Sequence, residues 1–426
     1  MSGFADHPLR YKLTNELHAR PFPSLKAPCT AVFLAVKQPS DAVGRDRSQD
    51  LAHLCALLDR HGAPHPQPNA THYSGDIGRH KLKWEQHTEF VTYTVFTEGL
   101  SVRPFDPAEF EVFPEDWLAA MPGVRMTSAL VRVEKRSKSE SLRQNLSDWF
   151  VPESLAVSDV LDGAAVVASD FRINPAGHMR MAVFVSPETG KRRVGRIVQR
   201  LCEIETYKSM SMLGFSRVRA MSPRLGALEG RLTELMAHIS GTDEGAEVTL
   251  DSLLQVSAEL ESLIAETSFR FGATEAYETI VNQRIKVLRE ERHDGRQSFG
   301  EFMMRRYDPA MRTVSSTKGR LQALADRAIR AGDLLRTKVD VSRSAQNQAL
   351  LESMDRRADL ALRLQETVEG LSVVAISYYA VSLASYAAYP LASLMGLTKG
   401  ELTAILTLPV VAVVWWMVKR IRSRVH

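Results

Sequence analysis

The densest group of side chains that could do chemistry lies near the start of the chain, in the segment NELHARP at residues 15–21. A carboxylate, an imidazole and a guanidinium this close together could bind an anion or serve acid–base chemistry. A segment of this kind also commonly caps a domain or fills a groove between subunits, so both interpretations stay open. The candidate binding residues are Glu16, His18 and Arg20.

Five histidines between residues 61 and 87 form a second group, but they have neither helical i, i+4 pairing nor a clear carboxylate partner. We therefore interpret that segment as a solvated loop, with a metal site as the alternative. The histidines are His61, His65, His72, His80 and His87. Further along, Glu203, Glu205 and Lys208 on a predicted helix are most simply explained by salt bridges within or between helices.

The three cysteines, Cys29, Cys55 and Cys202, lie far apart and form neither a metal-binding spacing nor a disulfide framework. Free cysteines of this kind fit a reducing compartment. No GxGxxG, Walker, HExxH or GxSxG motif is present. The sequence therefore predicts no cofactor and no bound metal, and it favours a protein that is not an enzyme.

The composition is that of a globular chain of about two or three domains. Of the 426 residues, 44% are hydrophobic and 24% are charged. The net charge of +4 is too small to indicate a nucleic-acid-binding protein. The first residues carry charges where a signal peptide would need an apolar stretch, so we expect the bulk of the chain not to be secreted.

Two apolar segments near the C-terminus predict a membrane hairpin. Residues 371–395 carry no charge and exceed the about 20 residues that a helix needs to cross the hydrocarbon core. The polar break 396–401 follows, and residues 402–418 form a second, shorter segment. Neither segment contains Asp, Glu, Lys, Arg or His, which argues against a proton relay or a charge-coupled carrier. The alternative is a buried helical hairpin in a soluble protein.

The charges around the hairpin predict its orientation. The tail 419–426 is basic, whereas the connecting loop carries one lysine and one glutamate. The positive-inside rule places such a basic end in the cytoplasm. Two spans return the chain to the side it came from, so we expect both termini on the cytoplasmic side.

The first span is rich in small and hydroxyl-bearing residues. Small residues mark close helix–helix packing in membranes, and a hydroxyl-bearing surface is also typical of a pore lining. A simple anchor with a packing face is at least as good an interpretation from composition alone. The pore-lining or packing candidates are Ser377, Ser382, Ser385, Tyr386 and Tyr389.

Residues 187–370 are predicted to be a helical and coiled-coil region. Pro223 is expected to end or restart one of its helices. No proline lies between Pro309 and Pro390, so one long stalk helix is expected to start near Met311 and to enter the first span without a break. Near its end, apolar residues recur at coiled-coil spacing, at Ala361, Leu364, Val368 and Leu371.

Residues 1–186 are predicted to form a cytoplasmic α/β domain. Strand patterns fall at 30–37, 89–97, 128–134, 164–168 and 178–186, and helical patterns at 50–60, 115–121 and 139–150. The fold class is therefore an α+β membrane protein. Its parts are the N-terminal domain, the helical region with its stalk helix, and the C-terminal two-helix hairpin.

Two stretches carry a resemblance to a known family. They are HPLRYKLTNELHARPFPSLKAP near the start and ETVEGLSVVAISYYAVSL near the end. Both resemble the bacterial domain-of-unknown-function family 3422, which is described as predicted membrane-anchored proteins, and the match spans essentially the whole chain. The resemblance implies a protein of the bacterial inner membrane with the lipid bilayer as its first partner.

The layout is also similar to that of CorA-type cation channels. These have a cytoplasmic α/β domain, a long helix running into the first span, a short external loop, a second span and a basic cytoplasmic end. CorA-type proteins are pentamers whose first spans line the pore, so the resemblance implies a homo-oligomer of five subunits. Their Gly-Met-Asn signature is missing here, and the matching place holds residues 385–390, SYAAYP. This departure argues against magnesium selectivity.

Three functions follow as hypotheses. The first is a CorA-like oligomeric ion channel or transporter with a cytoplasmic gating domain. The second is a membrane-tethered scaffold or ligand-binding protein without transport activity, in which the hairpin only anchors. The third and weakest is a membrane-bound enzyme that uses Glu16, His18 and Arg20.

Overall fold

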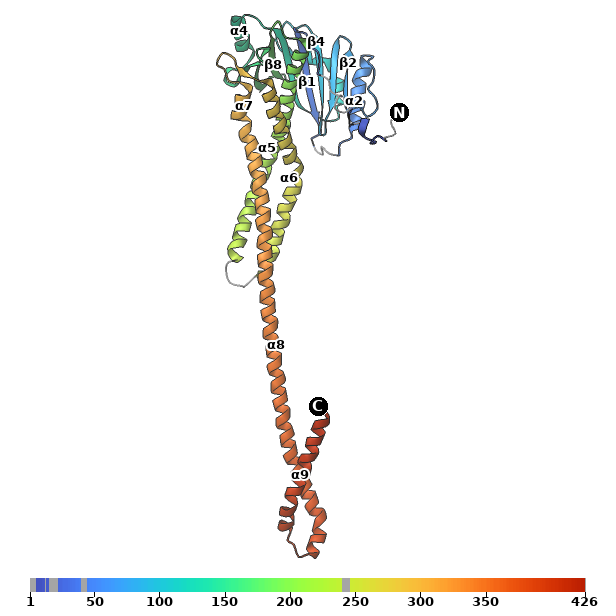
Figure 1. Ribbon diagram of the computed structural model, residues 1–426, viewed down its shortest axis with the longest axis vertical. Helices are drawn as coiled ribbons and strands as arrows, with labels where there is room; N and C mark the ends of the chain where they lie inside the picture. Colours follow the sequence, from blue (N-terminus) through green and yellow to red (C-terminus); the bar gives the residue numbers. More distant parts are fainter. Residues whose placement is uncertain (1–4, 12, 15–21, 40–43, 240–245, 426) are drawn as a thin grey trace. The chain divides into compact units, whose positions relative to one another are not determined.

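The computed structural model describes residues 5–11, 13–14, 22–39, 44–239 and 246–425. This part of the chain is an α+β protein with an N-terminal sheet domain and long C-terminal helices (Figure 1). The chain divides into two compact units. Unit 1 comprises Met1–Thr242 and Asp251–Ala331, and unit 2 comprises Asp243–Leu250 and Gly332–His426. Unit 1 therefore contains both the sheet and much of the region 187–370 that the sequence analysis treated separately.

Within the described residues, nine strands form one sheet in the order β2-β3-β4-β1-β5-β8-β7-β6-β9. Neighbouring strands are antiparallel except for the parallel pair β5 and β8. The strands are β1 (Cys29–Lys37), β2 (His72–Ile77), β3 (His80–Gln86), β4 (Phe90–Glu98), β5 (Val124–Lys135), β6 (Ala156–Val160), β7 (Ala165–Ile173), β8 (Met179–Val185) and β9 (Glu291–Arg292).

Both faces of the sheet are covered by apolar layers, which explains why every residue of β1 is buried. Val32, Leu34 and Val36 point into a core shared with the short helices of the N-terminal domain. Phe33 and its neighbours of the same parity point into the opposite core, which helix α5 covers. The short helices are α2 (Arg47–Arg60), η1 (Pro107–Val112), α3 (Glu115–Ala119), α4 (Ser139–Trp149) and η2 (Pro152–Ser154).

The C-terminal helices are α5 (Lys191–Ile239), α6 (Ala246–Leu288), α7 (Phe299–Arg306), α8 (Asp308–Leu394) and α9 (Lys399–Val425). In unit 1, α5, α6 and the first part of α8 share a third core. The buried residues of α5 in this core step by 3 and 4, as in a helical bundle: Val218, Met221, Leu225, Leu228 and Leu232. Gly214 allows the close approach of α6, because an added Cβ would stand 2.2 Å from Thr274 Oγ1.

Most of the predicted elements are present. Each predicted strand and each predicted short helix of the N-terminal domain overlaps an observed one. The interpretation of residues 61–87 as a loop was wrong, because β2 and β3 form a hairpin there, paired from His72 with Glu85 to Ile77 with His80. The connection in the hairpin is shorter than predicted, since α9 begins at Lys399 and runs into the basic tail.

The expectation that Pro223 ends a helix was also wrong, because α5 continues from Lys191 to Ile239 with Pro223 inside it. A proline in a helix interior removes one backbone hydrogen bond and crowds the preceding turn. The buried side chains on both sides of it, Met221 and Leu225, hold α5 in the three-helix core and outweigh this local cost.

Replacing Pro223 by alanine should therefore stabilise the protein. The side chain is exposed, so Pro223→Ala removes little packing and restores a backbone donor. We expect the free energy of unfolding to rise by about 1–3 kcal/mol. The thermal or denaturant midpoint of the full chain in detergent micelles measures this. Pro309→Ala is the matched control, because Pro309 is exposed and lies in the first turn of α8, where proline is well tolerated. An equal gain in both variants would contradict the explanation.

Candidate functional site

The residues predicted to bind a ligand near the N-terminus, Glu16, His18 and Arg20, lie outside the described residues. The nearest described residue after them is Phe22, which is 47% exposed and lines a pocket of unit 1. We consider two candidate sites, that pocket and the C-terminal hairpin.

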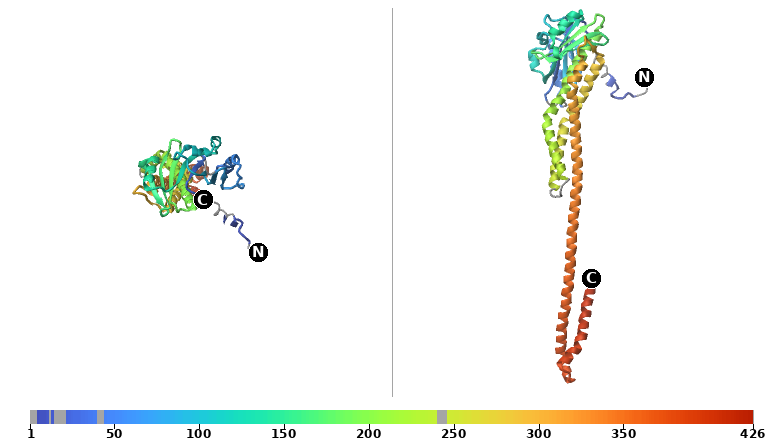
Figure 2. Two further views of the ribbon diagram at one scale, coloured as in Figure 1. Left: turned by 90° about the horizontal axis from the view of Figure 1, so that it is seen from above. Right: turned by 90° about the vertical axis from the view of Figure 1, so that its left-hand side faces the viewer.

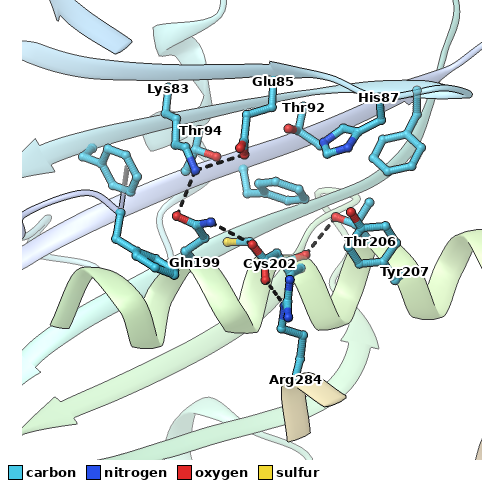
Figure 3. Close-up of a pocket in the computed structure, with 15 residues that line it drawn as sticks. Lys83, Glu85, His87, Thr92, Thr94, Gln199, Cys202, Thr206, Tyr207 and Arg284 are labelled. Atoms are coloured by element: carbon cyan, nitrogen blue, oxygen red, sulfur yellow. Dashed lines mark hydrogen bonds and ion pairs between the residues drawn. The ribbon is translucent and has the colours of Figure 1, made fainter. Parts of the chain in front are cut away.

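The pocket has a volume of about 240 Å³ and lies between one face of the sheet and helix α5. Figure 3 shows side chains of strands β3 and β4 on one side and side chains of α5 on the other, facing each other across it. Arg284 of α6 reaches the same space. The pocket therefore joins three elements that are far apart in the sequence.

The sequence periods of these elements explain why their side chains meet. Lys83 and Glu85 alternate with the buried Leu82 and Trp84 along β3, so they share the face toward α5. On α5 the lining residues follow one another at i, i+3, i+4 and i+7, which places them on one helical face. They are Gln199, Cys202, Glu203 and Thr206.

A continuous chain of polar contacts runs along the pocket. The Lys83 ammonium donates to Gln199 Oε1 at 2.8 Å and lies 3.1 Å from a carboxylate oxygen of Glu85. Gln199 Nε2 donates to Glu203 Oε1 at 2.7 Å. Glu203 in turn accepts a hydrogen bond from the guanidinium of Arg284. Two cations and two carboxylates thus alternate with an amide along the pocket, and their formal charges cancel.

The predicted salt bridges of α5 are confirmed. Glu203 pairs with Arg284 of α6, and Glu205 pairs with Lys208 one turn further along α5 at 2.7 Å. Lys83 and Glu85 were missed, because they fall in the segment that was interpreted as a loop. The alternation of polar and apolar residues in HKLKWEQ, residues 80–86, is the signal that identifies this strand.

Aromatic rings form the apolar part of the pocket. Phe33 and Phe96 are almost fully buried and line it from β1 and β4. The rings of His87 and Phe90 stack at a centroid distance of 4.3 Å, and Tyr207 meets Phe90 edge-on at 5.9 Å. These rings line the pocket together with the polar chain.

A buried ionic group next to Phe90 connects the sheet with α6. Glu89 is 1% exposed and accepts hydrogen bonds from the guanidinium of Arg270 and, at 2.8 Å, from the Tyr277 hydroxyl. Burial, and then the charge of Glu89, raises the pKa of Tyr277. Burial and the nearby Arg270 lower the pKa of Lys37. Because Arg270 and Tyr277 compensate the buried charge of Glu89, this group holds the start of β4 against α6.

In the second candidate site, helix α9 runs back along the end of α8 (Figures 1 and 2). The structure divides the five predicted pore-lining or packing residues into two sets. Ser377 and Ser385 are 7% and 4% exposed. With Val381 and Ala392 they form the face of α8 that is buried in the hairpin. Ser377 and Ser385 are therefore buried within a single chain.

The other three residues lie on a neighbouring, more exposed face of α8. Tyr386 and Tyr389 are 66% and 42% exposed, and Ser382 is half-buried. Tyr378, 70% exposed, continues the same face, since the four positions are spaced i, i+4, i+8 and i+11. We call this set, Tyr378, Ser382, Tyr386 and Tyr389, the hydroxyl stripe.

Among the described residues, no three or more His, Cys, Asp or Glu side chains come together in a way that could hold a metal ion. The five histidines illustrate this: His80 bonds Thr97 through Nδ1 at 2.6 Å, and His65 contacts Asp59 at 2.7 Å. His80 also accepts a hydrogen bond from Arg79 at 3.3 Å, so these two histidines already have polar partners.

Comparison with known proteins identifies the family of the chain. The model of the family described as "Protein of unknown function (DUF3422)" matches residues 5–425. The chain therefore belongs to this family, which confirms the resemblance in the sequence. No curated protein and no solved structure matches it.

The cysteines provide a test of the pocket's packing. Burial, and then Glu203, raises the pKa of Cys202, and burial raises that of Cys29 to about 12, whereas Cys55 is only half-buried. The thiolate is the reactive form, and one pKa unit changes its population about tenfold. At pH 8, chloroacetamide should label Cys55 at least about tenfold faster than the other two, as read by peptide mass spectrometry. All three should react in denaturant, and equal rates in the folded protein would contradict this packing.

Proposed function

We propose that this member of the DUF3422 family is a membrane-anchored homo-oligomer with a CorA-like layout, and that it conducts ions along a path surrounded by the first spans of its subunits. The observation that carries the proposal is the hydroxyl stripe of α8. The other arguments concern insertion into the membrane, orientation and assembly.

Membrane insertion is supported by the length and surface of two helices. In the described part of the chain, α8 and α9 each contain a stretch long and apolar enough to cross a membrane. Only 17% and 11% of these stretches are buried. A soluble core helix would be mostly buried, so these apolar surfaces need lipid or another subunit as a partner.

The orientation follows from the basic end of α9. Lys419 and Arg420 stack on Trp415 and Trp416, with the cations 5.0 and 5.1 Å from the ring centroids. Tryptophans with adjacent cations are typical of the interface on the cytoplasmic side. We infer that the sheet domain and both termini face the cytoplasm, and that the membrane is the bacterial inner membrane.

The hydroxyl stripe requires an environment other than lipid. An unpartnered hydroxyl in hydrocarbon costs roughly 2–7 kcal/mol, and the stripe places the hydroxyls of three exposed tyrosines on one face of a span. The Ser382 hydroxyl donates to the backbone oxygen of Tyr378 at 2.9 Å. A neighbouring face of α8 packs within the hairpin, and the three tyrosines of the stripe remain 42–70% exposed beside it. First spans that turn their stripes toward a common axis would supply either water or hydroxyl partners. A wetted, uncharged, hydroxyl-lined path is suited to ion passage.

Assembly is supported by the middle of α8. Leu364, Val368 and Leu371 repeat at coiled-coil spacing and are 67%, 54% and 66% exposed. In unit 1 the same kind of spacing is buried by α5 and α6. A second copy of α8 is the simplest partner for this exposed set. The CorA likeness suggests five copies.

The likeness to CorA-type channels does not extend to magnesium selectivity, because residues 385–390 do not contain Gly-Met-Asn and the connection offers no acidic ring. Lys399 instead lies over the ring of Tyr386, with its ammonium 4.7 Å from the centroid. A cation at this end of the hydroxyl stripe disfavours cation entry electrostatically.

A second candidate function is ligand binding without transport, and the pocket of unit 1 favours it. In that case the hairpin only tethers the sheet domain. An unrelated membrane anchor would then replace α9 and the end of α8 without loss of ligand binding.

Flux measurements distinguish ion conduction from ligand binding without transport. Purified oligomer in liposomes should show passive flux of potassium, magnesium or chloride with ion-specific dyes. Ser382→Trp should lower this flux at least about tenfold, because it fills the hydroxyl stripe. Leu383→Trp is the matched control, since the neighbouring side chain is 69% exposed and lies outside the stripe. A folded oligomer that passes none of these ions would overturn the channel proposal.

The stalk repeat predicts a change of assembly. Leu364→Lys places a charge in the exposed apolar repeat and should shift the protein toward monomers, because a buried lysine without a partner is costly. Mass photometry or light scattering in detergent measures the shift. Gln365→Lys, one position along on another face, should leave the oligomer unchanged. A monomeric wild-type protein, or equal effects of the two variants, would argue against a coiled-coil stalk.

A further inference from the structure

We propose that the pocket between strands β3 and β4 and helix α5 binds a small zwitterion with an apolar or aromatic side chain, a molecule of the class of the hydrophobic amino acids. The inference deepens the second function proposed above, ligand binding by the sheet domain. It does not depend on whether the hairpin passes ions.

The charge pattern of the pocket is the first argument. Lys83 and Arg284 supply positive charge, and Glu85 and Glu203 supply negative charge, within one connected chain. The four side chains are 9–35% exposed, so water screens them only in part. A ligand with a single net charge would leave that charge uncompensated in this partly buried space. A ligand with one group of each sign preserves the balance.

The polar chain has capacity left for such a ligand. An ammonium has three donors. Among the described residues, Lys83 uses two of them, on Gln199 and Glu85. Arg284 contacts Glu203 through Nε, which leaves its two terminal nitrogens for a carboxylate. Glu85 contacts Lys83 through Oε2, which leaves Oε1 to accept from an ammonium. Donors for an anion and an acceptor for a cation therefore face the same space.

The apolar wall is the second argument. Phe33 and Phe96 line the pocket beside the charged chain, and Phe22 borders it with half of its surface exposed. Aromatic rings favour an apolar or aromatic group by burial, and they attract an adjacent ammonium through their faces. A purely polar zwitterion would leave this wall wet, so the side chain of the ligand is apolar.

The size of the pocket is the third argument. Its 240 Å³ lies just below the range of about 300–1,000 Å³ that is usual for drug-sized ligands. A nucleotide with its phosphates exceeds that space and also brings net negative charge, whereas a single amino acid does not. The pocket thus fits a metabolite of amino-acid size.

The test uses a panel of four probes on the full-length protein in detergent micelles, by isothermal titration calorimetry. L-Tryptophan carries both charges, tryptamine lacks the carboxylate, indole-3-propionate lacks the ammonium, and adenosine is a neutral heteroaromatic molecule. We expect L-tryptophan to bind and each of the other three to bind at least about tenfold more weakly. A charge-assisted hydrogen bond contributes enough for a change of that size.

Two variants locate the binding. Glu85→Gln should weaken L-tryptophan binding at least tenfold and reduce the difference between L-tryptophan and indole-3-propionate, because the ammonium loses its partner. Arg284→Gln should do the same for the difference between L-tryptophan and tryptamine. Arg143→Gln is the matched control, since it breaks an ion pair with Asp294 outside the pocket and should leave binding unchanged. Circular dichroism and the thermal midpoint show whether each variant folds.

The panel on the wild-type protein decides the outcome even if a variant fails to fold. Equal or tighter binding of tryptamine, indole-3-propionate or adenosine would overturn the zwitterion class while leaving the pocket as a binding site. Binding of L-tryptophan that neither pocket variant changes would overturn the assignment to this pocket. No binding of any probe would overturn the inference and remove the support for the ligand-binding function. Ion flux, measured separately, does not bear on these results.

Discussion

The burial of one face of helix α5 against the sheet is the interaction on which the rest of unit 1 depends. Val194, Ile197 and Leu201 lose nearly all contact with water against β1, β5 and β8. Burying side chains of this size contributes about 1.5–3 kcal/mol each. Cys202 and Thr206 come next around the helix, and Gln199 and Glu203 lie beyond them, where Gln199 meets Lys83 of β3. The pocket is thus a consequence of how α5 packs on the sheet.

The same helix continues into the three-helix core. Burial in that core explains how the helix tolerates the free-energy cost of an internal proline. Pro223 interrupts the backbone hydrogen bonding of α5, yet Met221 and Leu225 on either side are buried by α6 and α8. Ionic contacts then join α6 to the sheet through Glu89 with Arg270, and to α5 through Glu203 with Arg284. Because these contacts are compensated and partly buried, they fix which helix faces which strand more than they add stability.

In the hairpin, the two faces of one helix meet different requirements. The face with Ser377 and Ser385 is smooth and lets α9 approach closely, whereas the face with Tyr378 and Tyr386 carries bulky hydroxyl groups outward. Small residues at a helix contact allow close packing, and exposed hydroxyls need polar partners. The division gives the hairpin an inner, intrachain side and an outer side with exposed hydroxyl groups, on which the proposed assembly rests.

The sequence by itself determined the features that depend on local periodicity and length. The uncharged segments 371–395 and 402–418, the unbroken α8 after Pro309, and most strands of the N-terminal domain follow from patterns within one stretch of chain. Residues 72–86 were assigned to a loop because their histidines and charges conceal the period of two that Leu82 and Trp84 mark. Only the tertiary structure decided that Lys83 and Glu85 face Gln199, that Ser385 lies inside the hairpin while Tyr386 lies outside, and that α5 continues through Pro223. Each of these depends on contacts between distant segments, whose burial energy exceeds local preferences and is not encoded in any single stretch.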